Sequence, residues 1–237
     1  MMDETLEPTM TVLRTAVAAP SRNALDRDER LVKDEILRMG SLVESQIRDA
    51  IRSIVERDSE LANRVIADDS RVNEAQRVIT DTVVMTIATQ SPVARDLRFL
   101  MALDHVAFEL ERIGDHASGI AKLARRLFEE PPIREIRDLA TMGNLAADLV
   151  RGVVTALIDI DDQVARAVAA RDDEIDHSYH QVFGQVIDLM RTDPRTVERG
   201  TRVILAAHWV ERIGDRVTNI AEDVVYLATG QVEDLNP

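Results

Sequence analysis

The sequence predicts an all-α protein made of two tandem antiparallel three-helix bundles, six helices in total, related by internal duplication. Apolar residues recur with helical spacing along most of the chain. Glycine and proline are scarce, at 9 and 7 of 237 residues, which leaves few turns for a β-protein. Aromatic residues make up only 3% of the chain, so the core is expected to consist of Ala, Val, Leu, Ile and Met.

Two pairs of matching segments reveal the duplication. The stretch "MGSLVESQIRDAIRSIVERD" begins at Met39, and "MGNLAADLVRGVVTALIDID" begins 103 residues later at Met142. Glu-Arg-Ile-Gly-Asp occurs at 111–115 and again 100 residues later at 211–215. We therefore expect a loose leader over residues 1–27, a first three-helix repeat over 28–130 and a second over 133–230.

Helix boundaries are indicated by capping residues and prolines. In the first repeat, helical spacing extends from about residue 30 to residue 56, and Asp58-Ser59 follows, where Ser59 can cap the second helix. Ser91-Pro92 ends that helix and starts the third, because a capping residue followed by proline is a common helix start. Asp193-Pro194 repeats this arrangement in the second copy.

The repeated pentapeptide places two carboxylates one helical turn apart. Glu111 and Asp115 therefore share one face of their helix, as do Glu211 and Asp215 in the second copy. Asn219 and Glu222 extend the second row. The apolar residues of that helix lie on the opposite side and are expected to face the core: Ile213, Val217, Ile220 and Val224.

These acidic rows carry two energetic costs in both copies. Carboxylates at i and i+4 repel by a few tenths of a kcal/mol, and a glycine within a helix costs about 1 kcal/mol relative to alanine. A solvated helix face explains one such row, but the repetition indicates a shared constraint. A hard cation such as Mg²⁺, Mn²⁺, Ca²⁺ or iron would offset the repulsion.

A second helix must complete any such cation site. Asp69 in the first repeat, and Asp172 with Asp176 in the second, lie at matching positions beside their core stripes. They can face the helix that carries the pentapeptide. An ordinary role as helix-flank carboxylates is an equally good interpretation of their spacing.

Three segments resemble the PhoU family of phosphate-specific transport system accessory proteins: "LRMGSLVESQIRDAI", "ELERIGDHASGIA" and "WVERIGDRVTNIAEDV". The resemblance covers about residues 28–229. It implies a cytoplasmic homodimer that negatively regulates the phosphate regulon and modulates phosphate uptake. It implies as partners the ATPase subunit of the phosphate transporter and a membrane sensor histidine kinase.

The resemblance also implies multinuclear metal clusters, with iron or zinc in some members. The residues expected to hold them here are Asp69, Glu111, Asp115, Asp172, Asp176, Glu211, Asp215, Asn219 and Glu222. The first repeat departs from the pattern, because Gly119 and Lys122 stand where the second has Asn219 and Glu222. A lysine opposes cation binding, so we expect tighter binding in the second repeat.

Composition disfavours several other functions. A net charge of −14 opposes binding to nucleic acid or anionic membranes. The chain has no cysteine, which excludes disulfides, zinc-thiolate sites and thiol catalysis. No apolar run approaches the ~20 residues of a membrane span. No nucleophile elbow or phosphate-binding G-x-x-x-x-G-K motif is present, so we expect a protein that is not an enzyme.

Two alternatives to a metal-binding regulator remain open. A carboxylate-bridged di-metal oxidoreductase needs two Glu-x-x-His motifs, and the chain offers one, Glu174 to His177. A helical scaffold without metal is the other alternative. His177 and His180 have no histidine counterparts in the first repeat and are expected to be surface residues.

Overall fold

The structure, a computed structural model, describes residues 22–133 and 137–236, and every regular element within them is a helix. The first repeat contains α1 (Arg22–Glu56), α2 (Ser59–Gln90) and α3 (Ala94–Leu127). The second contains α4 (Arg137–Asp159), α5 (Asp162–Ala169), α6 (Asp172–Thr192), the 3₁₀-helix η2 (Pro194–Thr196) and α7 (Val197–Thr229). The all-α prediction is confirmed, although α5 and α6 replace one continuous second helix.

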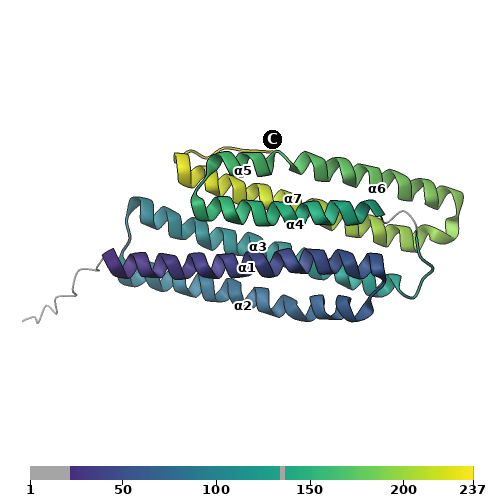
Figure 1. Cartoon of the computed structure of the whole chain (residues 1–237), viewed down its shortest axis with the longest axis horizontal. Helices are drawn as coiled ribbons and strands as arrows, with labels where there is room; N and C mark the ends of the chain where they lie inside the picture. Colours follow the sequence, from purple (N-terminus) through teal and green to yellow (C-terminus); the bar gives the residue numbers. More distant parts are fainter. Residues whose placement is uncertain (1–21, 134–136, 237) are drawn as a thin grey trace, which may run out of the picture.

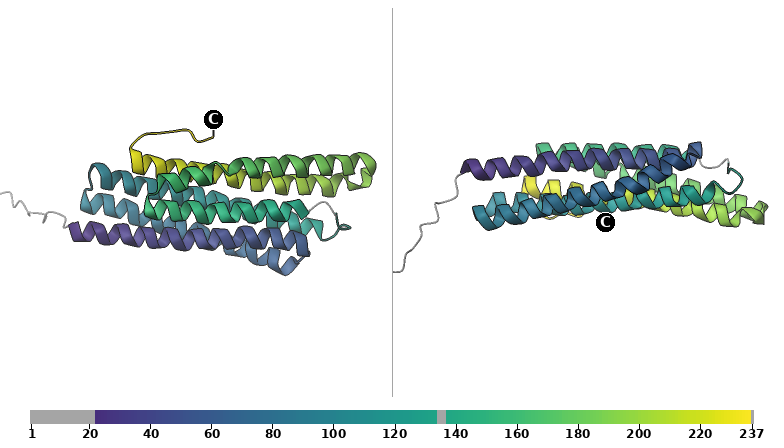
Figure 2. Two further views of the ribbon diagram at one scale, coloured as in Figure 1. Left: turned by 45° about the horizontal axis from the view of Figure 1, so that its top comes forward. Right: turned by 90° about the horizontal axis from the view of Figure 1, so that it is seen from below.

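The helices run roughly along the long axis of an elongated molecule (Figures 1 and 2). Four of them form the middle: α1 packs against α3 and α4, and α7 packs against the same two helices from the other side. In the first repeat α2 covers the outside, and in the second α5 and α6 do so. One continuous apolar core runs through both bundles, so the repeats are packed together rather than linked loosely.

Helix α1 begins earlier than its apolar spacing indicates. It starts at Arg22, inside the segment 1–27 expected to be a loose leader, and residues 1–21 of that segment lie outside the described residues. Leu25 is buried in the core. Arg22 pairs with Asp26 one turn later at 2.8 Å and also with Asp96 in the first turn of α3. Packing and ion pairs thus extend the helix.

The caps of the second helices are aspartates. Asp58 Oδ1 accepts a hydrogen bond from the Leu61 backbone N–H at 2.9 Å, and Ser59 is the first helical residue. The expectation that Ser59 caps α2 is therefore wrong. Asp161, which matches Asp58 in the second repeat, caps α5 by accepting from the backbone N–H groups at 163 and 164. Each aspartate satisfies amides that the helix leaves without partners.

The two helix starts predicted at a proline behave differently. Asp193 Oδ1 accepts from the Arg195 backbone N–H at 3.1 Å, and Pro194 begins η2, as predicted. Ser91 instead ends α2 in the left-handed conformation, with φ of 48°. Helix α3 begins only at Ala94, without a side-chain cap, so the prediction for Ser91-Pro92 is wrong in its register.

Helix α4 is long and apolar enough to cross a membrane by length and composition alone. Within its most apolar stretch, however, 56% of the residues are buried inside the protein. It packs against α1 and α7. The core helix of a soluble protein has these same properties.

Polar and charged side chains join α3 and α7 across the two repeats. Glu109 is only 3% exposed and receives Arg216 Nη1 at 3.3 Å. His105 Nδ1 lies 2.6 Å from Asp223 Oδ2, and this hydrogen bond raises the pKa of His105. These contacts fix the faces by which α3 and α7 meet. The acidic rows are left to face α2 and α6.

Gly119 of α3 makes room for Trp209 of α7. A Cβ atom at position 119 would lie 2.5 to 2.8 Å from three ring atoms of Trp209. Trp209 is partly buried and packs against the core. The glycine that interrupts the acidic row of the first repeat therefore has a packing role, and Trp209 is a packing residue between the repeats.

We predict that Gly119→Ala lowers the free energy of unfolding by about 1–3 kcal/mol, because the new methyl group overpacks the Trp209 contact. The roughly 1 kcal/mol gain in helix propensity reduces this loss only in part. Gly184→Ala in α6 is the matched control, because nothing lies within 4 Å of the added methyl group, and it should be stabilising. Urea unfolding of both variants tests this, and equal effects would contradict it.

Candidate metal centre

The first acidic cluster comprises Asp69 of α2 with Glu111 and Asp115 of α3. Burial and the charge of Asp115 raise the pKa of Asp69. Burial, Asp115 and, more weakly, Asp69 raise the pKa of Glu111. Among the described residues, Asp69 Oδ1 and Glu111 Oε2 are buried without a hydrogen-bond partner. The acidic rows of α2 and α3 therefore face each other closely enough for their charges to interact.

Cationic side chains partly neutralise the first cluster. Arg112 Nη1 lies 3.4 Å from Asp115 Oδ2, and its Nε lies 3.6 Å from Glu111 Oε2. Lys122 opposes the increase in the pKa of Asp69. Lys122 thus lies close enough to affect this cluster, where it would compete with a bound cation.

The second acidic cluster comprises Asp172 and Asp176 of α6 with Glu211 and Asp215 of α7. Asp172 is only 4% exposed. Burial, followed by the charges of Asp176, Asp215 and Glu211, raises its pKa to about 7. Burial and Asp215 raise the pKa values of Asp176 and Glu211 as well. Burial and the charge of Asp215 therefore oppose ionisation of the other three carboxylates of this cluster.

Cationic groups act on this second cluster as well: Arg212 opposes the increase in the pKa of Glu211, and His180 opposes that of Asp176. His208 Nδ1 lies 3.1 Å from Glu211 Oε2 and opposes the increase in the pKa of Glu211. Asp172 Oδ1 and Glu211 Oε2 are buried without a hydrogen-bond partner among the described residues. In the first cluster, the matching positions of the repeat, Asp69 and Glu111, likewise carry buried oxygens without a hydrogen-bond partner among those residues.

The glycines of the two pentapeptides, Gly114 and Gly214, pack against different side chains. A Cβ atom at Gly214 would overlap Asp172 Oδ1, so the missing side chain makes room for that carboxylate. A Cβ atom at Gly114 would lie 3.1 Å from Val72 Cγ1 and 3.3 Å from Gln46 Oε1. Sequence spacing did not identify Gln46, whose amide is buried without a hydrogen-bond partner in the described part of the chain.

Asn219 and Glu222 lie farther along α7 and border a cavity of about 470 Å³ with residues 232–236. Glu222 Oε1 accepts a hydrogen bond from the Leu235 backbone N–H at 3.0 Å. Asn236 Nδ2 donates to Asp172 Oδ2 at 3.2 Å. The sequence gives little indication of these contacts, because residues 231–236 lack helical spacing and follow the second repeat as it was delimited.

The arrangement suits a hard cation by its chemistry but is not a preassembled coordination shell. Its donors are mainly carboxylate oxygens, several of which are buried without a hydrogen-bond partner in the part of the chain that the structure describes. In the described ranges, no group of three or more Asp, Glu, His or Cys side chains stands close enough to hold one ion. A cation would have to draw these carboxylates together.

The Glu-x-x-His motif does not join either cluster. Glu174 and His177 are exposed. Glu174 Oε1 pairs with Arg171 at 3.0 Å, and His177 contacts Gln181 at 2.9 Å. The structure thus gives the di-metal oxidoreductase no support. The exposure of His177 and His180 confirms that both are surface residues.

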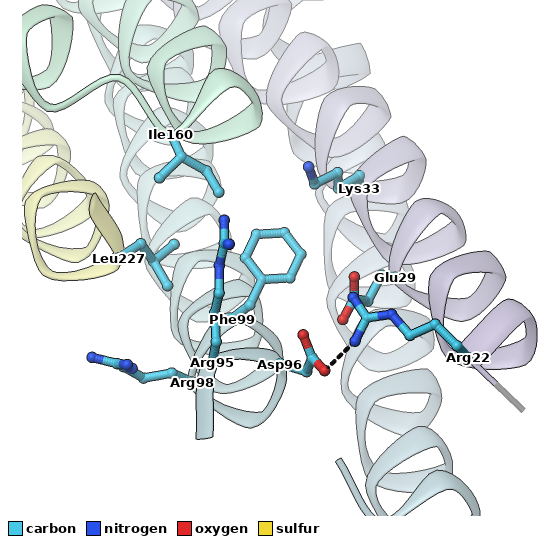
Figure 3. Close-up of a pocket in the computed structure, with 9 residues that line it drawn as sticks. All are labelled: Arg22, Glu29, Lys33, Arg95, Asp96, Arg98, Phe99, Ile160 and Leu227. Atoms are coloured by element: carbon cyan, nitrogen blue, oxygen red, sulfur yellow. Dashed lines mark hydrogen bonds and ion pairs between the residues drawn. The ribbon is translucent and has the colours of Figure 1, made fainter. Parts of the chain in front are cut away.

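A separate pocket of about 240 Å³ lies where α1, α3, the α4–α5 connection and α7 meet (Figure 3). It is lined by Arg22, Glu29, Lys33, Arg95, Asp96, Arg98, Phe99, Ile160 and Leu227. Lys33 Nζ lies 4.9 Å from the centre of the Phe99 ring. The pocket is rich in basic residues and contains no residue of the acidic clusters.

Comparison with known proteins agrees with this architecture. The PhoU domain family matches residues 36–124 and 139–224. A Clostridium acetobutylicum protein is 34% identical over 217 residues, which cover 91% of this chain and 99% of that protein. A Caulobacter vibrioides protein is 38% identical over 198 residues, which cover 83% and 86%. Both are named phosphate-specific transport system accessory protein PhoU homolog.

Two crystal structures share the fold. PhoU from Pseudomonas aeruginosa superposes with a TM-score of 0.83 at 34% identity, covering 89% of this chain and 100% of that chain. The phosphate transport system regulatory protein PhoU from Streptococcus pneumoniae gives a TM-score of 0.82 at 30% identity, covering 89% and 99%. The sequence matches span both repeats, and the structures match the helical architecture. This chain belongs to the PhoU family.

Proposed function

We propose that this chain is a metal-binding regulator of phosphate uptake that acts through protein contacts. It negatively regulates the phosphate regulon as a cytoplasmic homodimer that binds the ATPase subunit of the phosphate transporter and a sensor histidine kinase. Relatives named as accessory or regulatory proteins of phosphate transport support this role. The observation that carries metal binding is that, among the described residues, carboxylate oxygens at matching positions in both repeats are buried without a hydrogen-bond partner.

A bound cation would offset two unfavourable effects in each cluster, the burial of the carboxylates and their mutual repulsion. Burial and mutual repulsion both oppose ionisation of the carboxylates, and a cation favours the ionised form. The donors are oxygens except for His208 near the second cluster, a set that suits iron, Mn²⁺, Mg²⁺ or Ca²⁺. The family resemblance adds zinc to these candidates. Because the side chains must be drawn together, reorganisation reduces the net affinity.

The acidic surface supports a role in protein association. A net charge of −14 complements basic faces on a partner and accelerates encounter at low ionic strength. Co-purification with the transporter ATPase and the sensor kinase, at high and low phosphate and over a range of salt concentrations, tests this part of the proposal. Salt-sensitive complexes support it. Absence of a complex under every condition would refute it.

For metal binding, we predict that Glu211→Ala removes the tighter of two classes of Mn²⁺ site and that Glu111→Ala removes the weaker one. The second cluster should bind more tightly, because Lys122 partly neutralises the first, whereas the second repeat has Glu222 at the matching position. Isothermal titration calorimetry of the metal-free protein measures both classes. Glu174→Ala, which removes an exposed carboxylate of α6, is the control and should bind as the wild type does.

The metal-free scaffold makes the opposite prediction. If the carboxylates are only a solvated face, EDTA leaves the melting temperature unchanged and Mn²⁺ gives no binding heat. Equal losses of affinity in Glu111→Ala and Glu211→Ala would refute the asymmetry between the sites. These results test metal binding independently of the contacts with the transporter and the kinase.

A further inference from the structure

The chain turns back on itself after α7. Gly230 ends the helix in the left-handed conformation, with φ of 77°, and its N–H donates to the Tyr226 carbonyl at 2.8 Å. Residues 231–236, here called the C-terminal segment, then return along α7 toward the junction of α5 and α6 (Figure 1). This path brings the segment to the second acidic cluster.

Contacts of Glu233 and Leu235 anchor the C-terminal segment. Arg166 of α5 donates to both carboxylate oxygens of Glu233, at 2.7 and 2.9 Å. Such bidentate pairs fix orientation as well as position. The Leu235 backbone N–H donates to Glu222 of α7, and the Leu235 side chain packs against the core. The segment is thus held from two helices.

The end of the segment reaches the most buried carboxylate of the cluster. Asn236 Nδ2 donates to Asp172 Oδ2 at 3.2 Å, whereas Asp172 Oδ1 is buried without a partner in the part of the chain described. Thr218, only 2% exposed, also has a buried hydroxyl without a partner there. Asp172 and Thr218, each more than nine-tenths buried, therefore leave oxygen atoms available to a ligand.

The cavity between α7 and the C-terminal segment is lined mainly by oxygen donors. Its walls are formed by Asp215, Thr218, Asn219, Glu222, Val232, Glu233, Asp234 and Asn236. Apart from Val232, each of these side chains carries a carboxylate, an amide or a hydroxyl group. Hard divalent cations select such groups.

We infer that the C-terminal segment forms a third wall of the second metal site, where Asp234 and Asn236 supply additional oxygen ligands for a hard divalent cation. This inference rests on the proposed metal-binding function. It gives a second reason for asymmetry between the repeats. Lys122 occupies the position in the first repeat that corresponds to Glu222, so the residue that anchors Leu235 is absent from that helix.

The test uses full-length protein carrying Glu111→Ala, so that Mn²⁺ reports only the second site. Adding Asp234→Ala and Asn236→Ala should weaken Mn²⁺ binding roughly tenfold or more, the scale of effect seen when supporting groups of metal sites are lost. Gln231→Ala, in the same segment but outside the cavity lining, should leave affinity unchanged. The same changes in a Glu211→Ala background should not alter the first site.

A structural readout accompanies the affinity measurement. Hydrogen exchange should show that the Leu235 amide is protected in the wild type, less so in Arg166→Ala, and further protected when Mn²⁺ is added. If the wild type binds Mn²⁺ but the Asp234 and Asn236 changes leave second-site affinity intact, the inference is overturned while the proposed metal binding stands. If the wild type binds no Mn²⁺, the proposed metal binding itself fails.

Discussion

Asp172→Asn is expected to stabilise the metal-free protein by about 2–4 kcal/mol at pH 8, an effect that falls toward zero near pH 4. Asp172 is almost completely buried, and burial with three neighbouring carboxylates raises its pKa to about 7. In the unfolded chain this pKa returns to its ordinary value of 3.8. Above pH 7 the folded state must hold an ionised carboxylate that the unfolded chain accommodates in water.

The pH window follows from the direction of this shift. Between pH 4 and pH 7 the folded state binds more protons at Asp172 than the unfolded state does, so stability falls as pH rises. Asparagine has nearly the same shape and does not ionise, so it removes this penalty. The benefit of the substitution should therefore grow through that window and level off above it.

Urea unfolding in EDTA at several pH values between 5 and 8 measures this effect. Asp69→Asn is the matched control and should stabilise less, because Asp69 is half-buried and Lys122 opposes the increase in its pKa. With saturating Mn²⁺, the wild type should become more stable to urea than Asp172→Asn, because metal binding stabilises the wild type and the variant has lost a ligand. If Asp172→Asn is no more stable than the wild type at pH 8, ionisation of buried Asp172 does not destabilise the folded protein, and the prediction is wrong.

The repeated sequence pattern predicts which side of each helix faces the core, because this depends only on local periodicity. Ile213 and Val217 are buried on one side of α7, whereas Glu211 and Asp215 lie on the side facing α6. Helical spacing alone sets this division. Periodicity does not distinguish the adjacent residues Asp58 and Ser59 as caps, because both side chains can accept from the backbone and the course of the chain decides which one does.

Helical periodicity does not predict contacts between segments that lie far apart in the sequence. The break between α5 and α6 places Asp172 in the first turn of a helix, whereas Asp69 lies within continuous α2. The C-terminal segment depends on Arg166 binding Glu233, 67 residues away, and neither residue belongs to a recognisable motif. In the sequence, Gly119 only interrupts an acidic row, and the Trp209 ring that packs against it comes from a helix 90 residues away.

Gly214→Ala is expected to weaken Mn²⁺ binding at the second site by tenfold or more, whereas Gly114→Ala should change the first site only slightly. The added methyl group at 214 would overlap Asp172 Oδ1 and force that carboxylate out of its position. At 114 the methyl group meets Val72 Cγ1 at 3.1 Å, a contact that a small shift of the valine relieves. Displacing one ligand by a fraction of an ångström is enough to damage a metal site.

Affinity, rather than stability, distinguishes the roles of these two glycines. Overpacking at 214 costs about 1–3 kcal/mol, but alanine gains roughly 1 kcal/mol in helix propensity. Moving Asp172 toward solvent would also relieve the burial of its carboxylate. Titration of both variants with Mn²⁺, with the other site removed by Glu111→Ala or Glu211→Ala, therefore tests the assignment directly. Equal losses at both sites would show that the shared glycine serves helix packing, and that Asp172 does not determine cation affinity.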